Sequence, residues 1–220
     1  MTKNTIPVIA IDGPAGSGKG TLARALATHL EYDYLDTGSL YRAVAWKAMD
    51  DKIDPTNETE TTKIAQSILS ENLMNPGFRD EKVGEGASIV AAHPGVRKAL
   101  FDVQKGFGSN KFKAKKGAIL DGRDIGTKIF PETPLKFFIT ASAETRAERR
   151  FKELQSMGKA CNYGDVLRDI KARDARDSTR KVDPLTPADD AIVIDTSGLD
   201  PDHVVEKVLS VIRSKTRGLS

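Results

Sequence analysis

The sequence predicts an α/β fold with a doubly wound, parallel sheet of five strands. Five short apolar runs stand out, and most are continuous rather than alternating, as expected for strands that helices cover on both faces. Stretches with a helical pattern separate these runs, and such alternation is typical of parallel sheets. Polar residues follow the strands at 12–13, 36–38 and 121–124. Since ligands bind at the carboxyl edge of open parallel sheets, we expect the functional site there.

The expected elements follow one another in a regular order. Strands are expected at Val8–Ile11, at Tyr34–Leu35 leading into Asp36, at Ala118–Leu120 ending at Asp121, at Leu135–Thr140, and at Ala191–Ile194 ending at Asp195. Helices are expected at 19–30, 39–50, 59–71, 81–105, 143–157, 164–178 and 201–214. Pro94 should break or kink the fourth of these helices. Because no repeat, low-complexity tract or Pro/Gly linker divides the chain, residues 1–220 are expected to form one domain.

A glycine-rich segment joins the first strand to the first helix. Residues 13–21 read Gly-Pro-Ala-Gly-Ser-Gly-Lys-Gly-Thr. Glycine lets the backbone fold tightly and turn successive N–H groups toward an anion, and the helix that follows adds the positive end of its dipole. Lys19 supplies a charge that can reach a terminal phosphate. Strand, loop, lysine and helix together predict a phosphate-binding loop (P-loop) for a nucleoside triphosphate.

The hydroxyl residue of this loop is displaced by one position. In most P-loops Ser or Thr follows the lysine directly and ligates magnesium, whereas here Gly20 intervenes and the hydroxyl comes at Thr21. The Gly-Lys-Gly-Thr form resembles the nucleoside monophosphate kinases more than the signalling GTPases. The chain also contains no Asn-Lys-x-Asp guanine-reading motif. Both features argue against a GTPase.

Composition excludes several other classes of protein. A net charge of +3, from 34 basic and 31 acidic residues, is too small to indicate nucleic-acid binding. The sequence has no run of 18 apolar residues and no secretory signal pattern, so no membrane partner is expected. Cys161 is the only cysteine and cannot form an internal disulfide, which favours a reducing compartment. We therefore expect a cytoplasmic protein.

The polar segment Asp36–Arg42 runs from the second strand into a helix. One interpretation is a helix start, with Thr37 or Ser39 as the N-cap and Asp36 favourably placed at the dipole. Capping does not explain Arg42, which lies a turn into the helix on a face that can look over the sheet edge. This residue favours a functional role for the segment.

The polar segment Asp121-Gly122-Arg123-Asp124 follows the third strand. It could form no more than a local Asp–Arg ion pair in a loop. However, Arg123 suits bidentate binding of a phosphate, and Asp124 is an acceptor suited to an exocyclic amine. Its position at the ligand edge favours binding.

Arginines recur on the two helical stretches that follow the fourth strand. Arg173, Arg176, Asp177 and Arg180 lie at i, i+3, i+4 and i+7, which is one stripe of a helix. The stripe could be a solvated face in which Asp174 and Asp177 offset the repulsion. Arg146, Arg149 and Arg150 lie on the preceding stretch, and a bend flanked by Gly158 and Gly164 joins the two. Such helices can form a mobile lid that brings positive charge to phosphates, here over residues 146–180.

Four segments, taken in order, resemble the signature segments of bacterial cytidylate kinases: Ile11–Thr21, Asp36–Arg42, Asp121–Thr127 and Arg173–Asp177. The resemblance extends from Pro7 to about Lys207. It implies a P-loop NTPase type of fold with a monophosphate-binding insertion at residues 52–105 and a helical lid. It also implies the reaction ATP + (d)CMP ⇌ ADP + (d)CDP with Mg²⁺, carried out by a monomer.

The resemblance further implies roles for matched residues. ATP would be bound by Gly13, Pro14, Ala15, Gly16, Ser17, Gly18, Lys19, Gly20, Thr21 and Arg149. CMP would be bound by Thr37, Tyr41, Arg42, Ser88, Arg97, Arg123, Asp124, Arg173, Asp177 and Arg180. In this second set, Arg42, Arg123 and Arg180 would hold the phosphate, Asp177 the sugar hydroxyls, and Ser88, Arg97 and Asp124 the cytosine. Lys19, Arg123, Arg176 and Arg180 would act in catalysis, and no residue is assigned as a metal ligand.

The chain departs from the family's pattern at two places. Residues 70–80 are too few for the small antiparallel sheet often found in the insertion, so a reduced insertion is expected. Gln104-Lys105 stands where Gln-Arg is usual, and Lys lacks the fork geometry of Arg.

Two alternatives to a cytidylate kinase remain at this point. One is a P-loop kinase for another small acceptor, such as a different nucleotide or a hydroxy acid. The other is a nucleotide-binding regulator without catalytic activity. Turnover with CMP would separate the first hypothesis from both.

Overall fold

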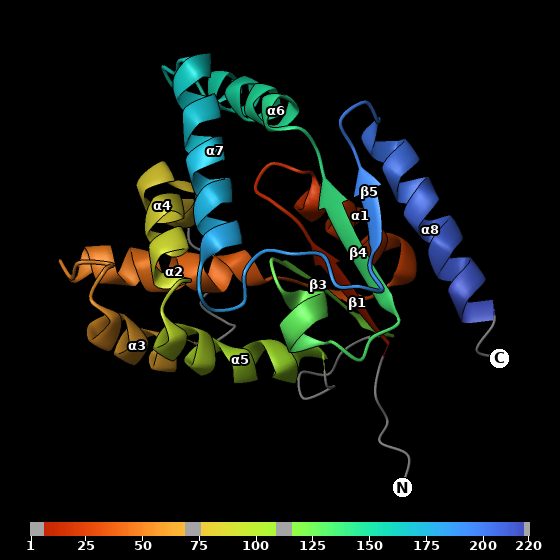
Figure 1. The fold of residues 1–220 in the computed structure, drawn as a ribbon, viewed down its shortest axis with the longest axis horizontal. Coiled ribbons are helices and arrows are strands. Elements are labelled where there is room, and N and C mark those ends of the chain that lie inside the picture. The colour runs from red at the N-terminus through yellow and green to blue at the C-terminus, as the bar shows by residue number, and fades with distance from the viewer. Residues whose placement is uncertain (1–6, 69–75, 109–115, 218–220) are drawn as a thin grey trace, which may run out of the picture.

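The computed structural model describes residues 7–68, 76–108 and 116–217. At its centre lies a five-stranded sheet, all parallel, with strand order β2-β3-β1-β4-β5 (Figure 1). The strands are β1 (Val8–Asp12), β2 (Asp33–Asp36), β3 (Ala118–Gly122), β4 (Leu135–Thr140) and β5 (Ile192–Asp195). The predicted α/β fold with a parallel sheet is therefore confirmed.

The helices also follow the expected order. They are α1 (Lys19–Leu30), α2 (Thr37–Asp50), α3 (Glu58–Ser67), α4 (Glu81–Val90), α5 (Pro94–Gly108), α6 (Ala143–Ser156), α7 (Tyr163–Thr179) and α8 (Pro201–Arg217), with a 3₁₀ turn η2 (Pro76–Arg79) and a π-helical turn η3 (Ile125–Ile129). The stretch expected as one helix over 81–105 is two, as the break at Pro94 predicts. Proline is accepted at the first position of α5 because an N–H there has no intrahelical partner. None of the helices in the described part of the chain is long and apolar enough to cross a membrane.

Two apolar cores lie on opposite faces of the sheet. On one face, Ile9, Ile11 and Phe137 pack with residues of α1 and α8. On the other face, Ala10 and Leu120 pack with residues of α2, α4 and α5. The sheet is thus doubly wound, and this is why its central strands read as continuous apolar runs.

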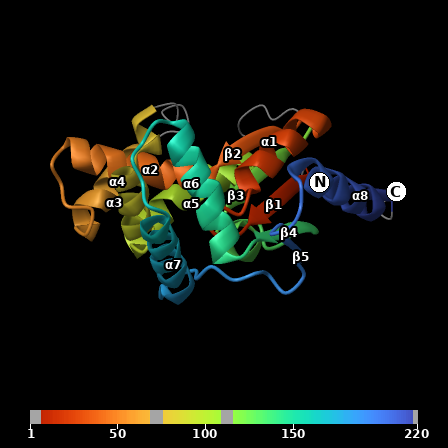
Figure 2. The ribbon, with the colours of Figure 1, turned by 90° about the horizontal axis from the view of Figure 1, so that it is seen from above.

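Helices α6 and α7 form an arm that packs together around an apolar cluster of its own, which comprises Ala147, Leu154, Val166 and Ile170. Figure 1 shows this arm above the sheet, and Figure 2 shows it between α2–α5 on one side and the sheet with α1 on the other. The arm includes most of residues 146–180, and that this segment is a mobile lid stays a prediction. In the insertion expected at 52–105, most of the shortened segment 70–80 lies outside the described residues, apart from η2 and the N-cap of α4.

Candidate active site

The loop between β1 and α1 has the geometry of an anion-binding loop. Gly13, Gly16 and Gly18 have φ angles of 147°, 74° and 90°, which side-chain-bearing residues rarely adopt. A Cβ at Gly13 would lie 2.0 Å from the carbonyl oxygen of Ile139, so the position requires glycine. Helix α1 begins directly after Gly18, and its N-terminal amides therefore end at the loop. The buried Ser17 Oγ has no hydrogen-bond partner among the described residues, so a polar donor is available there for a ligand.

Lys19 is buried at the base of this loop, where Nζ donates a 2.9 Å hydrogen bond to the carbonyl oxygen of Pro14. Burial, assisted by the charge of Arg123, lowers the pKa of Lys19 to about 7, against the opposing effect of Asp121. Burial and the neighbouring Asp36 raise the pKa of Asp121 to about 7. A phosphate beside Lys19 would favour the charged ammonium, so anion binding and full protonation of Lys19 support each other.

Two oxygen atoms that could ligate a metal ion lie beside Gly20, the residue that stands where most P-loops have Ser or Thr. A Cβ at Gly20 would lie 3.4 Å from Asp121 Oδ2 and 3.6 Å from the Tyr34 hydroxyl. That hydroxyl donates a 3.0 Å hydrogen bond to the same carboxylate oxygen, while Thr21 is exposed. No cluster of three or more His, Cys, Asp or Glu residues that could enclose a metal occurs in the described ranges. The glycine thus leaves room next to a carboxylate where most P-loops place a hydroxyl.

The raised pKa of Asp121 predicts how stability changes with pH. Between pH 4.5 and 6.5 folded Asp121 holds its proton and the unfolded carboxyl releases it, so stability falls as pH rises. The pKa of Lys19, about 7, lies above this interval, so Lys19 is mainly protonated in both states. In the Asp121→Asn variant, we expect the free energy of unfolding to fall by about 2 kcal/mol less between these pH values, since each pKa unit corresponds to about 1.4 kcal/mol. Urea unfolding of both proteins at the two pH values measures this, and parallel declines would contradict the assignment.

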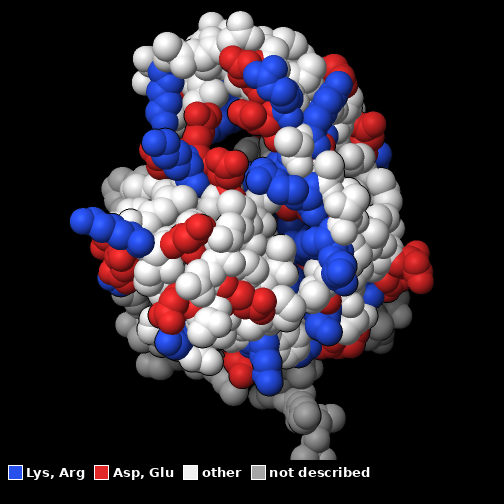
Figure 3. Space-filling view, turned by 60° about the vertical axis from the view of Figure 1, so that its left-hand side comes forward, with Lys and Arg blue, Asp and Glu red and all other residues white. Residues whose placement is uncertain are grey.

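A polar pocket lies next to the P-loop at the carboxyl ends of β2 and β3. Nine of the ten residues predicted to bind CMP line it: Thr37, Tyr41, Ser88, Arg97, Arg123, Asp124, Arg173, Asp177 and Arg180. The tenth, Arg42, instead donates a 2.7 Å hydrogen bond to the carbonyl oxygen of Phe78. Figure 3 shows a hollow on one face of the molecule with both basic and acidic side chains along its rim. The fold thus brings together residues that the sequence separates by up to 143 positions, from Thr37 to Arg180.

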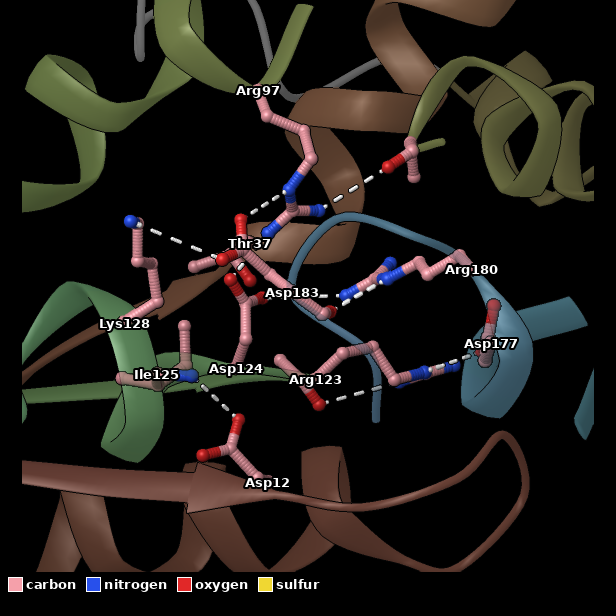
Figure 4. A network of polar contacts seen from close by, with 12 residues as sticks. Asp12, Thr37, Arg97, Arg123, Asp124, Ile125, Lys128, Asp177, Arg180 and Asp183 are labelled. Carbon is pink, nitrogen blue, oxygen red and sulfur yellow. Dashed lines mark hydrogen bonds and ion pairs between the residues drawn. The ribbon is translucent and has the colours of Figure 1, made fainter. Parts of the chain in front are cut away.

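The charged side chains of this pocket pair across elements (Figure 4). Arg123 Nε donates a 2.8 Å hydrogen bond to Asp177 Oδ2, and Ser88 Oγ lies 3.3 Å from Asp177 Oδ1. Arg97 forms an ion pair with Asp124, and Arg180 Nη2 lies 3.8 Å from Asp124 Oδ1. The alternative of an isolated local ion pair within 121–124 is therefore wrong, because Arg123 and Asp124 both pair with distant residues.

Two buried arginine donors in the pocket have no hydrogen-bond partner among the described residues: Arg173 Nε and Arg180 Nη2. Burial and the nearby Arg123 lower the pKa of Arg173 to about 10, and burial and Arg97 lower the pKa of Arg180. Positive charge is crowded here, because Arg97, Arg123, Arg173 and Arg180 all line the pocket. Because buried cationic donors are costly without an acceptor, the pocket is suited to a phosphate group.

The first residue of α2, Thr37, bonds to strand β3, and no side chain caps the helix. Thr37 Oγ1 donates a 2.7 Å hydrogen bond to the carbonyl oxygen of Asp121. The N-cap residue is Asp36, so the expectation that Thr37 or Ser39 is the N-cap is wrong. The hydroxyl is taken by β3, which lies beside β2 in the sheet.

The arginine stripe divides at the end of α7. Arg173 and Asp177 line the pocket, whereas Arg176 is exposed, with Nη1 3.8 Å from Glu85. The helix ends at Thr179, so Arg180 lies just beyond it in extended backbone and not at the i+7 position of a helix. The extended backbone lets its side chain reach the pocket from the loop side.

Arg146 of α6 contacts the P-loop directly, and Arg149 is connected to it through Thr196. Arg149 donates hydrogen bonds of 3.1 and 2.6 Å to the side chain and carbonyl of Thr196, whose hydroxyl is 3.1 Å from the Ser17 carbonyl oxygen. Arg146 donates to the carbonyl oxygen of Ala15 at 3.2 Å and pairs through two hydrogen bonds with Asp174. The sequence assigned Arg146 only to the lid, since nothing in its spacing indicates a contact with the P-loop.

Lys105, which replaces the family's usual arginine, lies outside this pocket. Its Nζ donates hydrogen bonds to the carbonyl oxygen of Ile129 and to Glu132, at 2.6 and 2.7 Å. It therefore ties α5 to the turn η3, a connection that a single ammonium group can make.

A parallel sheet of this order, a P-loop with its lysine, and an arginine-lined pocket beside a helical arm define a kinase of the P-loop class. The sequence profile of the cytidylate kinase family matches residues 9–214. The chain is 50% identical over 208 residues to a cytidylate kinase from Paramagnetospirillum magneticum, covering 94% of this chain and 98% of that protein. It is 45% identical to a cytidylate kinase from Rhodopseudomonas palustris, with 96% and 98% covered. The chain belongs to the cytidylate kinase family.

Solved structures support the fold at lower similarity. A gluconokinase from Sinorhizobium meliloti is 14% identical, with a TM-score of 0.50 over 98% of this chain and 96% of that one. An uncharacterized protein from Eubacterium ventriosum is also 14% identical, with a TM-score of 0.53 over 94% and 99%. At these identities the likeness concerns the architecture alone.

Proposed function

We propose that this protein transfers the γ-phosphoryl group of ATP to CMP or dCMP, giving ADP and CDP or dCDP. The observation that carries the proposal is the pocket beside the P-loop. There, donors of Arg173 and Arg180 that make no hydrogen bond among the described residues lie together with the buried Asp124 carboxylate. The arginine donors can bind a phosphate, and the Asp124 carboxylate can accept a hydrogen bond from the N4 amine of cytosine. The family and its named relatives support the same reaction. They do not favour another acceptor or a regulator without activity.

In this assignment the pocket divides into three parts. Arg123, Arg173 and Arg180 bind the monophosphate. Asp177 binds the sugar hydroxyls, and its carboxylate is kept ionised because Arg123, Arg173 and Arg180 outweigh burial and lower its pKa. Ser88, Arg97 and Asp124 bind the cytosine, whose N3 and O2 accept hydrogen bonds and whose N4 donates them. Uracil reverses the donor pattern at two of these atoms, so the same groups would penalise it.

Catalysis in this proposal is electrostatic and positional. Lys19 and the arginines offset negative charge on the γ-phosphoryl as it moves in line to the acceptor oxygen. No side chain has to remove a proton. The Asp121 carboxylate, the exposed Thr21 hydroxyl and the phosphates offer the hard oxygen ligands that Mg²⁺ requires, and the ion would supply positive charge to offset that of the phosphates. Asp121 and Thr21 are the residues that we propose to hold it.

A coupled assay of ADP release across the nucleoside monophosphates tests the proposal. Turnover should be highest with CMP and dCMP and should require ATP and Mg²⁺. Highest turnover with another monophosphate would assign a different acceptor. Tight ATP binding with no turnover on any of them would identify a regulator. Size-exclusion chromatography in the same buffer tests the accompanying proposal of a monomer, and the free Cys161 is in keeping with a cytoplasmic site of action.

The arm of α6 and α7 should close over bound substrates. Its own apolar cluster lets it move as a body, and Gly158, with φ of 70°, lies in the bend between the two helices. We expect ATP and CMP together to protect residues 150–180 from hydrogen exchange more than either ligand alone. Helix α8, on the far side of the sheet, serves as the internal control. Equal protection with and without both ligands would show that the arm is rigid.

A further inference from the structure

Asp183 connects three parts of the molecule at the edge of the acceptor pocket. It lies in the segment between α7 and β5, outside every motif discussed above. Arg97 Nε, from α5, donates a 2.8 Å hydrogen bond to Asp183 Oδ2. Lys128 Nζ, from η3, lies 3.9 Å from Oδ1, and Arg180 Nε donates a 2.7 Å hydrogen bond to the Asp183 carbonyl oxygen. Figure 4 shows Asp183 among these three basic side chains.

With Asp183 as an acceptor, all three guanidinium nitrogens of Arg97 are hydrogen-bonded. Arg97 is 7% exposed, and the other two nitrogens of its guanidinium donate hydrogen bonds to Asp124 and to the carbonyl oxygen of Ala91. Three acceptors from three different segments therefore determine the plane and position of this group. Burial lowers the pKa of Arg97, but Tyr41, Asp124 and Asp183 outweigh burial and raise it.

The backbone at Asp183 is held in an uncommon conformation. Its φ is 45°, in the left-handed region that Gly, Asn and Asp tolerate best. On either side the chain is tied down, since Arg180 bonds to the Asp183 carbonyl and the Leu185 amide donates a 2.8 Å hydrogen bond to the carbonyl oxygen of Asp177. A strained residue that its surroundings hold in place is often found where geometry serves function.

We propose that Asp183 is a positioning residue for the acceptor nucleotide: its carboxylate holds Arg97 in the plane that receives the base, and its carbonyl holds Arg180 at the phosphate. This inference rests on the proposed function. Asp183 contacts Arg97 and Arg180, and its hydrogen bonds and ion pairs among the described residues do not involve the P-loop. Its loss should therefore weaken binding of the acceptor and leave ATP binding unchanged.

Substitution by Gly and by Asn separates the carboxylate from the backbone geometry. Asp183→Gly removes the acceptor and keeps the positive φ, whereas Asp183→Asn keeps an oxygen acceptor for Arg97 and tolerates the same φ. We expect the Gly variant to raise KM for CMP about 10-fold or more, with kcat within about 3-fold and KM for ATP unchanged, as for a lost charge-assisted hydrogen bond. The Asn variant should recover most of the affinity. Asp189→Gly, at an exposed carboxylate of the same segment, is the matched control.

Binding of CMP measured by calorimetry, without ATP, should repeat these ratios. An unchanged KM and Kd for CMP in the Gly variant would overturn the proposal. Equal losses for CMP and ATP, together with a lowered melting temperature in both variants, would also overturn it, because they indicate a purely structural role. If the wild-type protein does not phosphorylate CMP, the proposed function fails independently of these comparisons.

Discussion

Lys19→Ala should lower kcat by about 10²-fold or more, because removing a group that stabilises the transferring phosphoryl typically has an effect of that size. The amine lies at the base of the P-loop, where its present partner is the Pro14 carbonyl oxygen. Its pKa of about 7 means that bound phosphates also determine its charge. The variant should keep its fold, because the Lys19 side chain makes one hydrogen bond, to Pro14, and alanine is accepted at the first position of α1.

Steady-state kinetics and thermal unfolding of the same preparations measure both effects. Lys152→Ala provides the matched control, because this lysine is exposed on α6 and pairs only with Glu148 among the described residues. The control should retain full activity. A Lys19→Ala protein with more than about a tenth of the wild-type kcat would contradict the electrostatic role of Lys19.

Asp124→Asn should change the choice of base. The carboxylate is buried, and burial raises its pKa against the opposing charges of Arg97 and Arg180. An amide can donate a hydrogen bond as well as accept one, so it can bind the O4 of uracil, which a carboxylate cannot. Loss of a charge-assisted hydrogen bond, roughly 1.5–3 kcal/mol, should lower kcat/KM for CMP about 10- to 100-fold. The value of kcat/KM for UMP should fall much less, or rise.

The ratio of the two values of kcat/KM, wild type against variant at one magnesium concentration, reports this change directly. Since Asp124 also pairs with Arg97, unfolding of the variant should be measured in parallel. If both substrates lose activity together and the ratio stays constant, Asp124 has a structural role. Cytosine recognition would then depend on Ser88 and Arg97.

Much of the fold was predictable because its signals are local. The strand β1, the glycines of the loop and Lys19 are adjacent in sequence, and their conformations follow from backbone sterics and the helix dipole. The break before α5 follows from the missing N–H of Pro94. The resemblance then extended the prediction to residues such as Ser88 and Arg97, which have no local signal but lie in the pocket.

The partners of the charged side chains were not predictable in this way. Arg146 lies against the P-loop, Arg123 pairs with Asp177, and Asp183 bonds to Arg97, across separations of 131, 54 and 86 residues. The sequence by itself determined the elements, the P-loop and the class of chemistry, because each depends on near neighbours. Only the tertiary structure decided which carboxylate neutralises which arginine and which donors stay free for a ligand. Those choices depend on distances and burial that arise when the two faces of the sheet, the arm and the loop after α7 pack together.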